Sequence, residues 1–220
     1  LHRLRALRRL DRDSAGGEGH ALTDEGGRCS AVGTAVPAQH VDAPAPVSLA
    51  QRPSHWAQPI DLAGVPNLHR ISDHLYRSEQ PTAEGFRNLE KLGIRTVINL
   101  RYFNDDDEEA EGTGLRLERV KILTWRAGDR HVVEVMRMLR QKDNGPFLIH
   151  CQHGADRTGL MSAMYRVLEQ NWTPQDALAE LIDGGYGFHR MWKNIKRYVT
   201  EMDPVALRAA IDAANGSPGS

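Results

Sequence analysis

The sequence predicts an α/β fold in which a mostly parallel central sheet of about four to five strands is flanked by helices. Short apolar runs alternate along the chain with segments whose apolar residues recur at helical spacing, which is the pattern of strand–helix–strand units. The run at 95–100, RTVINL, is β-branched and mostly apolar, as in a strand buried within a parallel sheet. Residues 56–203 carry this pattern, and their number is normal for a single domain.

The 220 residues divide into three parts. Residues 1–55 are rich in Ala, Gly, Pro and Arg and lack periodic apolar spacing, so we expect a disordered or leader segment. Residues 56–203 are the expected folded domain, and residues 204–220 are expected to form a short helix and a frayed tail. The basic opening LHRLRALRRL resembles the start of a signal peptide, but no intact apolar stretch follows it. We therefore favour a leader without a function of its own, and this terminus does not decide export.

Composition argues against several classes of protein. A net charge of −1 gives no sign of a nucleic-acid-binding protein. No apolar run is long enough to span a membrane. The two cysteines, Cys29 and Cys151, do not form a disulfide framework, although a bond between them after oxidation remains a hypothesis. We expect a monomer that binds no nucleic acid and has no membrane span.

The first elements of the domain can be placed from their flanking residues. Residues 74–78, HLYRS, are a strand candidate. Thr82 is a suitable N-cap for the helix that follows, Phe86 and Leu89 share its apolar face, and Gly93 ends it. The strand at 95–100 comes next.

An acidic run then separates two strands. Six carboxylates lie between Asp105 and Glu111, most simply in a solvated loop. Residues 115–123 alternate between apolar and polar, as a strand does. Asp129 is well placed as the N-cap of the next helix, whose buried side includes Val132 and Met136.

The second half of the domain is centred on the stretch 146–160, PFLIHCQHGADRTGL. Residues 147–150 are predicted to be a buried strand, and a helix is expected from about Thr158 to Gln170. A Thr173-Pro174 start and a Gly184-Gly185 end define a further helix. A loop at 186–190 either borders the pocket or is an ordinary surface loop, which is the interpretation we favour, and it precedes a last helix at 191–199.

The stretch between the buried strand and its helix has the chemistry of an anion site with a nucleophile in it. Loop and first-turn N–H groups point at one spot when a tight loop joins a strand to a helix. Cys151 lies at the start of this loop, and a thiol at a helix N-terminus beside a guanidinium favours the thiolate, which is the nucleophile. Arg157 can clamp two phosphate oxygens, and the remaining oxygens are expected to bind N–H groups of the loop, which are those of Gln152, His153, Gly154, Ala155, Asp156 and Arg157. A phosphate ester fits this site, and attack by Cys151 gives a cysteinyl-phosphate that water later hydrolyses.

The leaving group also needs a proton donor. Asp129 is the first candidate, because it follows a strand whose end lies at the same edge of the sheet as Cys151. Asp105, Asp106 and Asp107 are alternatives, and Asp156 is expected to turn outward and bind loop or helix N–H groups.

Two further residues are expected to support the loop. Thr158 can donate its hydroxyl to the sulfur when the thiolate leaves. His150 either hydrogen-bonds the loop and tunes the thiolate or is a simple core histidine.

At this point the residues resemble a known family. The pattern His150-Cys151, five residues, then Arg157-Thr158-Gly159 resembles the signature loop of cysteine-based protein tyrosine phosphatases. The segments LYRSEQPT, TVINLR and AMYRVLEQNW and the loop carrying Trp125 and Asp129 are similar to the small bacterial dual-specificity-like group, which includes periplasmic tyrosine phosphatases of Gram-negative bacteria.

This resemblance implies a metal-free phosphatase without a cofactor, with Cys151 as nucleophile, Arg157 as phosphate clamp and Asp129 as general acid. It implies hydrolysis of phosphotyrosine, with phosphoserine and phosphothreonine as further substrates, in a phosphorylated protein or a small phosphate ester. It also implies a periplasmic location, with the cytoplasm as the alternative. One departure is that Arg126-Ala127-Gly128 separates Trp125 from Asp129, unlike the compact Trp-Pro-Asp loop of larger phosphatases.

Three other functions would use part of the same set of residues. A phosphoinositide or other small-molecule phosphatase uses the same loop, and Arg126, Arg130 and Arg190 are its candidate additional cations. A sulfurtransferase has no need of the Arg157-Thr158 pair or of an acid loop. A non-catalytic phosphate-binding module has no need of both Cys151 and Arg157.

Overall fold

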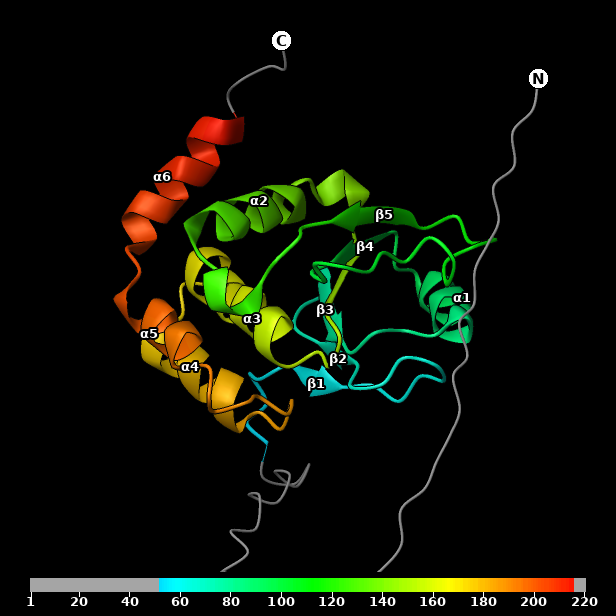
Figure 1. Cartoon of the computed structure of the whole chain (residues 1–220), viewed down its shortest axis with the longest axis horizontal. Helices are drawn as coiled ribbons and strands as arrows, with labels where there is room; N and C mark the ends of the chain where they lie inside the picture. The colour runs from blue at the N-terminus through cyan, green and yellow to red at the C-terminus, as the bar shows by residue number, and fades with distance from the viewer. Residues whose placement is uncertain (1–51, 216–220) are drawn as a thin grey trace, which may run out of the picture. The chain divides into compact units, whose positions relative to one another are not determined.

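The computed structural model describes residues 52–215 of the chain, most of it the domain expected from the sequence. The leader at 1–51, with Cys29 and any disulfide that this residue makes, lies outside the described residues. Figure 1 shows strands in the middle of the described part and helices on both sides of them.

The sheet has six strands in the order β1-β2-β3-β6-β4-β5. Their bounds are Gln58–Pro59 for β1, His69–Arg70 for β2, Leu75–Ser78 for β3, Thr96–Asn99 for β4, Arg116–Arg119 for β5 and Phe147–His150 for β6. The four strands from β3 to β5 in this order are parallel, and β1 and β2 extend one edge antiparallel. The predicted mostly parallel sheet is therefore confirmed. The two extra strands have two residues each, which is too short to give an alternating sequence pattern.

Strand β6 lies between β3 and β4, so it is buried on both faces of the sheet. Ile149 of β6 pairs with Ile98 of β4, and their side chains join the larger apolar core. Leu148 and Val97, one residue earlier in the same register, join the smaller core on the opposite face. This alternation between faces is the two-residue period of a strand.

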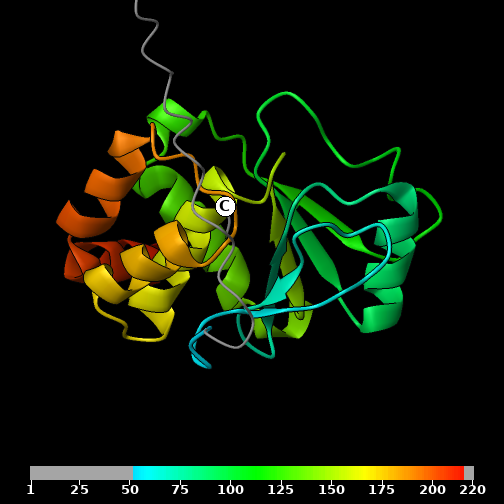
Figure 2. The ribbon, with the colours of Figure 1, turned by 90° about the horizontal axis from the view of Figure 1, so that it is seen from below.

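Helices cover the two faces unequally, as Figure 2 shows. Helix α1, Ala83–Leu92, covers the smaller core. The opposite face carries α2 at Asp129–Arg140, α3 at Asp156–Glu169, α4 at Pro174–Asp183, α5 at Lys193–Glu201 and α6 at Pro204–Asn215. Short 3-10 turns occur at Thr124–Arg126, η2, and at Lys142–Asn144, η3. None of the described helices is long and apolar enough to cross a membrane.

Both cores are completed by helical side chains. Phe86 and Leu89 of α1 are fully buried, and burying a side chain of this size stabilises the fold by about 1.5–3 kcal/mol. Leu207 and Ile211 of α6 are buried in the larger core, so this last helix belongs to the packed structure.

Helix ends follow the sequence signals with a few shifts. Thr82 Oγ1 accepts from the N–H of Gly85 at 3.2 Å, and Gly93 ends α1 at φ +97°. Thr173 likewise caps α4 by accepting from Asp176 N–H at 3.1 Å. The prediction for α2 was wrong by one residue: Gly128 is the N-cap, and Asp129 is already the first helical residue.

Two other helix starts differ from their predicted positions. Helix α3 begins at Asp156, two residues before the expected Thr158, so the loop that follows Cys151 is shorter than the sequence indicated. Helix α5 begins at Lys193, two residues after the expected Met191.

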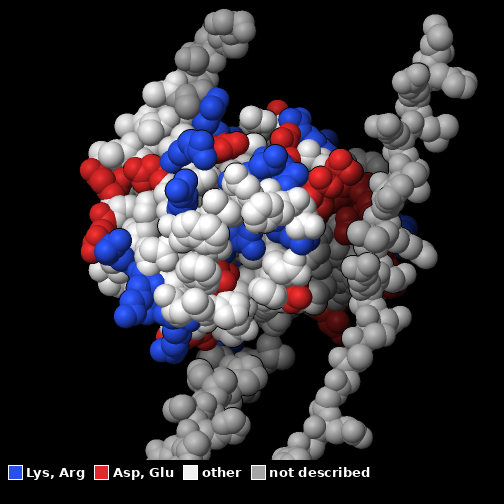
Figure 3. Space-filling view, in the orientation of Figure 1, with Lys and Arg blue, Asp and Glu red and all other residues white. Residues whose placement is uncertain are grey.

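The parallel strands bring three loops to one edge of the sheet. Ser78 of β3 and Asn99 of β4 both pair with His150 of β6, each as the last residue of its strand. The segments that follow these residues therefore start side by side. Acidic and basic side chains occur close together on the face drawn in Figure 3, which agrees with a net charge near zero.

Candidate active site

Cys151 occupies the first position after the central strand. Strand β6 ends at His150, and α3 begins at Asp156, so a loop of four residues separates Cys151 from the helix. The thiol side chain is 2% exposed. Because the loop runs into the N-terminus of a 14-residue helix, N–H groups and the positive end of the helix dipole lie at its far side.

Gly154 shapes this loop. Its φ of +64° lies in the left-handed region that favours glycine. A Cβ at this position would lie 2.6 Å from the carbonyl group of Ser78 and from the N–H of Glu79. The loop is therefore packed against the end of β3, and no other residue fits at Gly154 without moving one of them.

Arg157 lies in the first turn of α3 and crosses to the neighbouring strands. Its Nη1 donates to the carbonyl of Leu100 at 3.4 Å and to that of Ile122 at 3.5 Å. These carbonyls follow β4 and β5 in the chain. Both contacts are long, and they hold the guanidinium at the carboxyl edge of the sheet, where Cys151 also lies.

Two polar side chains of the loop region have different surroundings. The hydroxyl of Thr158 is fully buried, and within the described residues Oγ1 has no hydrogen-bond partner. The carboxylate of Asp156 accepts from the N–H of His189 at 3.0 Å and pairs with its Nδ1 at 2.8 Å. Asp156 thus turns away from the loop, as expected, but the N–H group that it binds belongs to His189 in the segment before α5 and not to the loop or its helix.

His150 and Asp106 form a buried pair that the sequence did not indicate. His150 Nε2 lies 2.7 Å from Asp106 Oδ2, and Gln80 also donates to this carboxylate at 2.9 Å. Burial on its own would raise the pKa of Asp106, but the hydrogen bond and the charge interaction with His150 outweigh it and lower the pKa. Asp106 is 3% exposed, and His150 has a specific partner and is not a plain core residue.

The other carboxylates of the acidic run lie differently. Asp105 pairs with Arg119 at 3.4 Å, and Asp107 is exposed. Asp106, Asp105 and Asp107 all line a separate pocket with Leu117, and that pocket does not contain Cys151.

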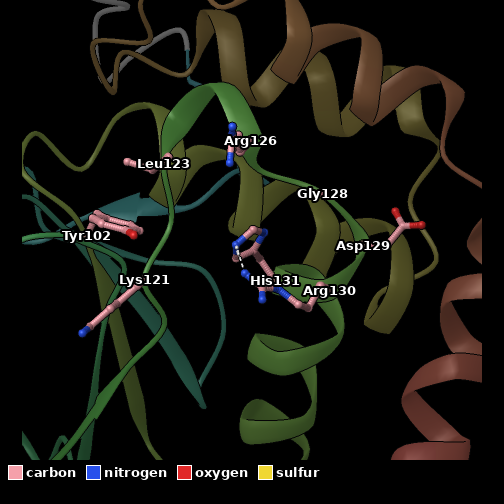
Figure 4. Close-up of a pocket in the computed structure, with 8 residues that line it drawn as sticks. All are labelled: Tyr102, Lys121, Leu123, Arg126, Gly128, Asp129, Arg130 and His131. Atoms are coloured by element: carbon pink, nitrogen blue, oxygen red, sulfur yellow. Dashed lines mark hydrogen bonds between the residues drawn. The ribbon is translucent and has the colours of Figure 1, made fainter.

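Asp129 is exposed and its side chain is bound to another helix. Tyr198 of α5 donates its hydroxyl to Asp129 Oδ1 at 2.6 Å. Burial and this hydrogen bond raise the pKa of Tyr198. Figure 4 shows the carboxylate pointing away from Arg126 and His131, which lie on the other side of the backbone. The structure therefore places Asp129 at the start of α2, directly after the predicted loop, with its carboxylate turned toward α5.

Next to this loop is a cavity of about 370 Å³. Four of the residues that line it are basic: Lys121, Arg126, Arg130 and His131. Arg130 Nη2 lies 3.3 Å from His131 Nε2, and this contact is drawn in Figure 4. Lys121 and His131 were not recognised from the sequence, because a single lysine in a strand and a histidine in a helix give no signal of their own.

Arg77 and Tyr186 were also missed. Arg77 of β3 is 1% exposed and donates from Nη2 to the carbonyl of Gly154 at 2.6 Å. Tyr186 is 2% exposed and lies in the larger core, so the interpretation of 186–190 as an ordinary surface loop was wrong for its first residue. A fully buried arginine beside the loop is not visible in a sequence, since arginine in a strand is usually at a surface.

The fold and the loop together define a class of protein. A parallel sheet presents a cysteine loop at its carboxyl edge, and an arginine in the first turn of the next helix faces the same edge. This is the arrangement of a cysteine-dependent phosphatase, in which the loop binds phosphate and the thiolate attacks it.

Comparison with known proteins gives the family. Residues 65–189 match the family described as "Tyrosine phosphatase family", so the chain belongs to that family. It is 37% identical over 171 residues to the dual specificity protein phosphatase TpbA of Pseudomonas aeruginosa, covering 77% of each chain. It is 32% identical over 128 residues to an inositol diphosphatase of Arabidopsis thaliana, covering 54% of this chain and 62% of the relative.

Solved structures agree with the fold. A crystal structure of P. aeruginosa TpbA superimposes with a TM-score of 0.66 at 36% identity, over 72% of this chain and 98% of that chain. A second crystal structure of TpbA, in complex with pTyr, gives a TM-score of 0.67. The catalytic core of a yeast PP-IP phosphatase shares the fold at 22% identity and a TM-score of 0.61. The predicted resemblance to bacterial dual-specificity phosphatases is confirmed.

Proposed function

We propose that this protein hydrolyses phosphate monoesters of tyrosine, and also of serine or threonine, through a cysteinyl-phosphate. The observation that carries the proposal is the loop from Cys151 to Arg157 at the carboxyl end of the central strand. TpbA, at 37% identity, is named as a dual specificity protein phosphatase, which supports the same substrate class for this chain. We further propose that the protein acts as a monomer, which light scattering of the purified protein tests.

The first chemical step is attack of the Cys151 thiolate on phosphorus. The S–P bond forms while the bond from phosphorus to the tyrosine oxygen breaks, and that oxygen takes a proton from the carboxyl group of Asp129. Loop N–H groups and the guanidinium of Arg157 hold the non-bridging oxygens. For this pose the Arg157 guanidinium exchanges its long contacts with the carbonyls of Leu100 and Ile122 for the phosphate.

The second step frees the enzyme. Asp129, now a carboxylate, takes a proton from water as the water oxygen attacks phosphorus, and the S–P bond breaks to release inorganic phosphate. The buried hydroxyl of Thr158, without a protein partner among the described residues, is free to donate to the departing thiolate. Thr158 directly follows Arg157 at the end of the loop, and its side chain is fully buried there.

Asp129 must change its partner before it can act in either step. Its carboxylate accepts from Tyr198 at 2.6 Å, so the side chain has to leave Tyr198 and turn toward the anion loop. Losing one hydrogen bond of this kind costs about 0.5–1.5 kcal/mol, which is small enough for the side chain to move during each catalytic cycle.

The deciding experiment is turnover of p-nitrophenyl phosphate and of a phosphotyrosine peptide. Cys151→Ser is expected to reduce kcat by about 10⁴-fold or more, because the nucleophile is lost. Cys29→Ser is the matched control, and it should retain wild-type turnover. Turnover that persists in Cys151→Ser would overturn the mechanism.

A second candidate function is hydrolysis of a small molecule that carries more than one phosphate. The cavity favours it, since the cations Lys121, Arg126 and Arg130 line a volume of about 370 Å³ beside a residue that Arg157 contacts. A relative at 32% identity is named as an inositol diphosphatase. Comparing kcat/KM for an inositol polyphosphate and for the phosphotyrosine peptide distinguishes the two functions. Arg130→Ala should lower the first value and spare the second if the cavity binds an additional phosphate.

A further inference from the structure

Next to the loop that follows Cys151 lies a group of interacting side chains that the proposed mechanism does not use. It comprises the buried residues Arg77, Arg166, Glu180 and Tyr186 and the partly buried Arg52. Glu180 is its one carboxylate among the described residues, and Arg166 engages it at 2.7 Å and 2.9 Å through two nitrogens. The Glu180 carboxylate is therefore already paired with Arg166.

Arg77 is the cation of this group that reaches the loop. Its guanidinium carbon lies 3.6 Å from the centre of the Tyr186 ring, and Nη2 donates to the carbonyl of Gly154 at 2.6 Å. Its Nε has no hydrogen-bond partner within the described part of the chain. Among the described residues Arg77 makes no hydrogen bond to a carboxylate, and a buried guanidinium is costly unless negative charge is close to it.

Cys151 is one of the groups whose negative charge can balance this guanidinium. Strand β3 pairs with β6 so that Arg77 is opposite Ile149, two residues before Cys151. Burial lowers the pKa of Arg77, and charge interactions with Tyr186, Glu180 and Cys151 act in the opposite direction. The attraction is mutual, so the same guanidinium favours the thiolate over the thiol.

From this geometry we propose that Arg77 is a positioning residue of the phosphatase: it fixes the carbonyl of Gly154 and holds a buried positive charge behind the loop that stabilises the Cys151 thiolate. The proposal rests on the function proposed above. In this proposal, part of the positive charge that stabilises the thiolate comes from a residue outside the signature loop. Arg157 remains free to bind the substrate, because the thiolate has a second cation on its inner side.

Other groups around Arg77 do not replace it. Arg52 donates to the Tyr186 hydroxyl at 2.6 Å and lies beyond the ring. His69 packs edge-on against the same ring at 4.8 Å, and burial lowers its pKa to about 4, so it carries no charge near neutral pH. His150 is directed to Asp106, and Asp156 is held by His189. Arg77 is therefore a buried cation that donates directly to a carbonyl of the loop, and Arg157 lies at the end of the same loop.

The test measures ionisation of Cys151 without using catalysis. The rate of alkylation by iodoacetamide is followed from pH 4 to pH 9, and its midpoint reports formation of the thiolate. Arg77→Gln and Arg77→Met, which remove the charge, should move the midpoint upward by about one pH unit. Arg77→Lys keeps the charge and should hold the wild-type midpoint, while its kcat falls because ammonium cannot reproduce the contact with Gly154.

The control is Arg166→Met, which disrupts the same buried group without approaching Cys151. It should lower thermal stability and leave the midpoint in place. A midpoint that stays at the wild-type value in folded Arg77→Gln or Arg77→Met overturns the proposal. If neither neutral variant folds, the Lys variant decides, because a shift of a full pH unit despite the retained charge also overturns it.

Failure of this inference and failure of the proposed function give different results. If the protein is not a phosphatase, p-nitrophenyl phosphate turnover is absent from the wild type, but the alkylation midpoints still order the variants as stated. If Arg77 has no role in ionisation, turnover of the wild type is normal and the midpoints of all variants coincide.

Discussion

The inner and outer sides of the phosphate loop are built in opposite ways. On the inner side, Arg77, Tyr186 and Glu180 are buried and closely packed, and the Glu180 carboxylate is bound by Arg166, Tyr186 and an N–H group. On the outer side, Trp125 is 61% exposed, Asp129 is exposed, and the contact that holds Asp129 is with Tyr198 of α5.

This difference separates two tasks. A rigid nucleophile and anion site give a faster reaction, because groups that are already in place need not reorganise in the transition state. A general acid must move, since it meets the leaving group only after the substrate has bound. The four predictions below test this division, beginning with the largest effect.

Removing the carboxylate from the inner side should have the largest effect on stability. Glu180→Ala leaves Arg166 buried without its partner, and breaking such a pair costs about 3–5 kcal/mol of unfolding free energy. Urea denaturation of the two proteins measures the difference. Glu201→Ala is the matched control, because Glu201 makes an exposed 4.0 Å pair with Arg197 and its loss should cost less than about 0.5 kcal/mol. Equal losses in both variants would remove the contrast between the two sides.

Removing the carboxylate on the outer side should affect rate and leave stability almost unchanged. Asp129→Asn is expected to lower kcat for a poor leaving group by about 10²-fold, because proton donation is lost, and to flatten the pH profile of kcat. Its unfolding free energy should change by less than about 1 kcal/mol, since the residue is exposed. An unchanged pH profile would assign proton donation to a different group.

The buried pair behind the loop should give stability that depends on pH. The pKa of Asp106 is lowered in the folded protein, so its contribution to stability is present above the ordinary carboxyl pKa of about 3.9 and is lost as the pH falls toward the folded value. Asp106→Asn should cost about 2 kcal/mol at pH 7 and much less at pH 3. Thermal melts of both proteins over this range check the sign. A cost that grows on acidification would contradict it.

The smallest effect on rate is expected when Asp129 loses its hydrogen bond to Tyr198. Tyr198→Phe removes the hydrogen bond that turns Asp129 toward α5 and keeps the ring. Since one such bond is worth about 0.5–1.5 kcal/mol, kcat should rise by a few-fold when loop movement limits the rate. Stopped-flow measurement of the burst with p-nitrophenyl phosphate checks this result. A slower burst in Tyr198→Phe would mean that the tyrosine holds the acid in its working position.

How far the sequence predicts the molecule depends on whether a feature is local. The Thr82 and Thr173 caps and the glycine at 93 were predicted correctly, because a cap is formed by residues a few positions apart. The cysteine loop was predicted for the same reason. The mostly parallel sheet followed from the alternation of strands and helices.

What the sequence did not reveal is formed between distant segments. Asp106 and His150 lie 44 positions apart, and the contact of Arg77 with Gly154 spans 77 positions. Neither pair has a spacing that a local pattern can recognise. Asp129 shows the intermediate case, since its place in the chain was predicted, whereas its bond to Tyr198 depends on the packing of α5 beside the loop.

The hydrogen bond between Tyr198 and Asp129 also bears on inhibition. Compounds that imitate phosphate must carry charge to compete at the loop, and charge hinders passage through membranes. A neutral compound that holds Tyr198 and Asp129 together would stop proton donation without entering the anion site. Its selectivity would come from α5, which lies outside the loop that defines the family, so related phosphatases with another residue at this position would escape it.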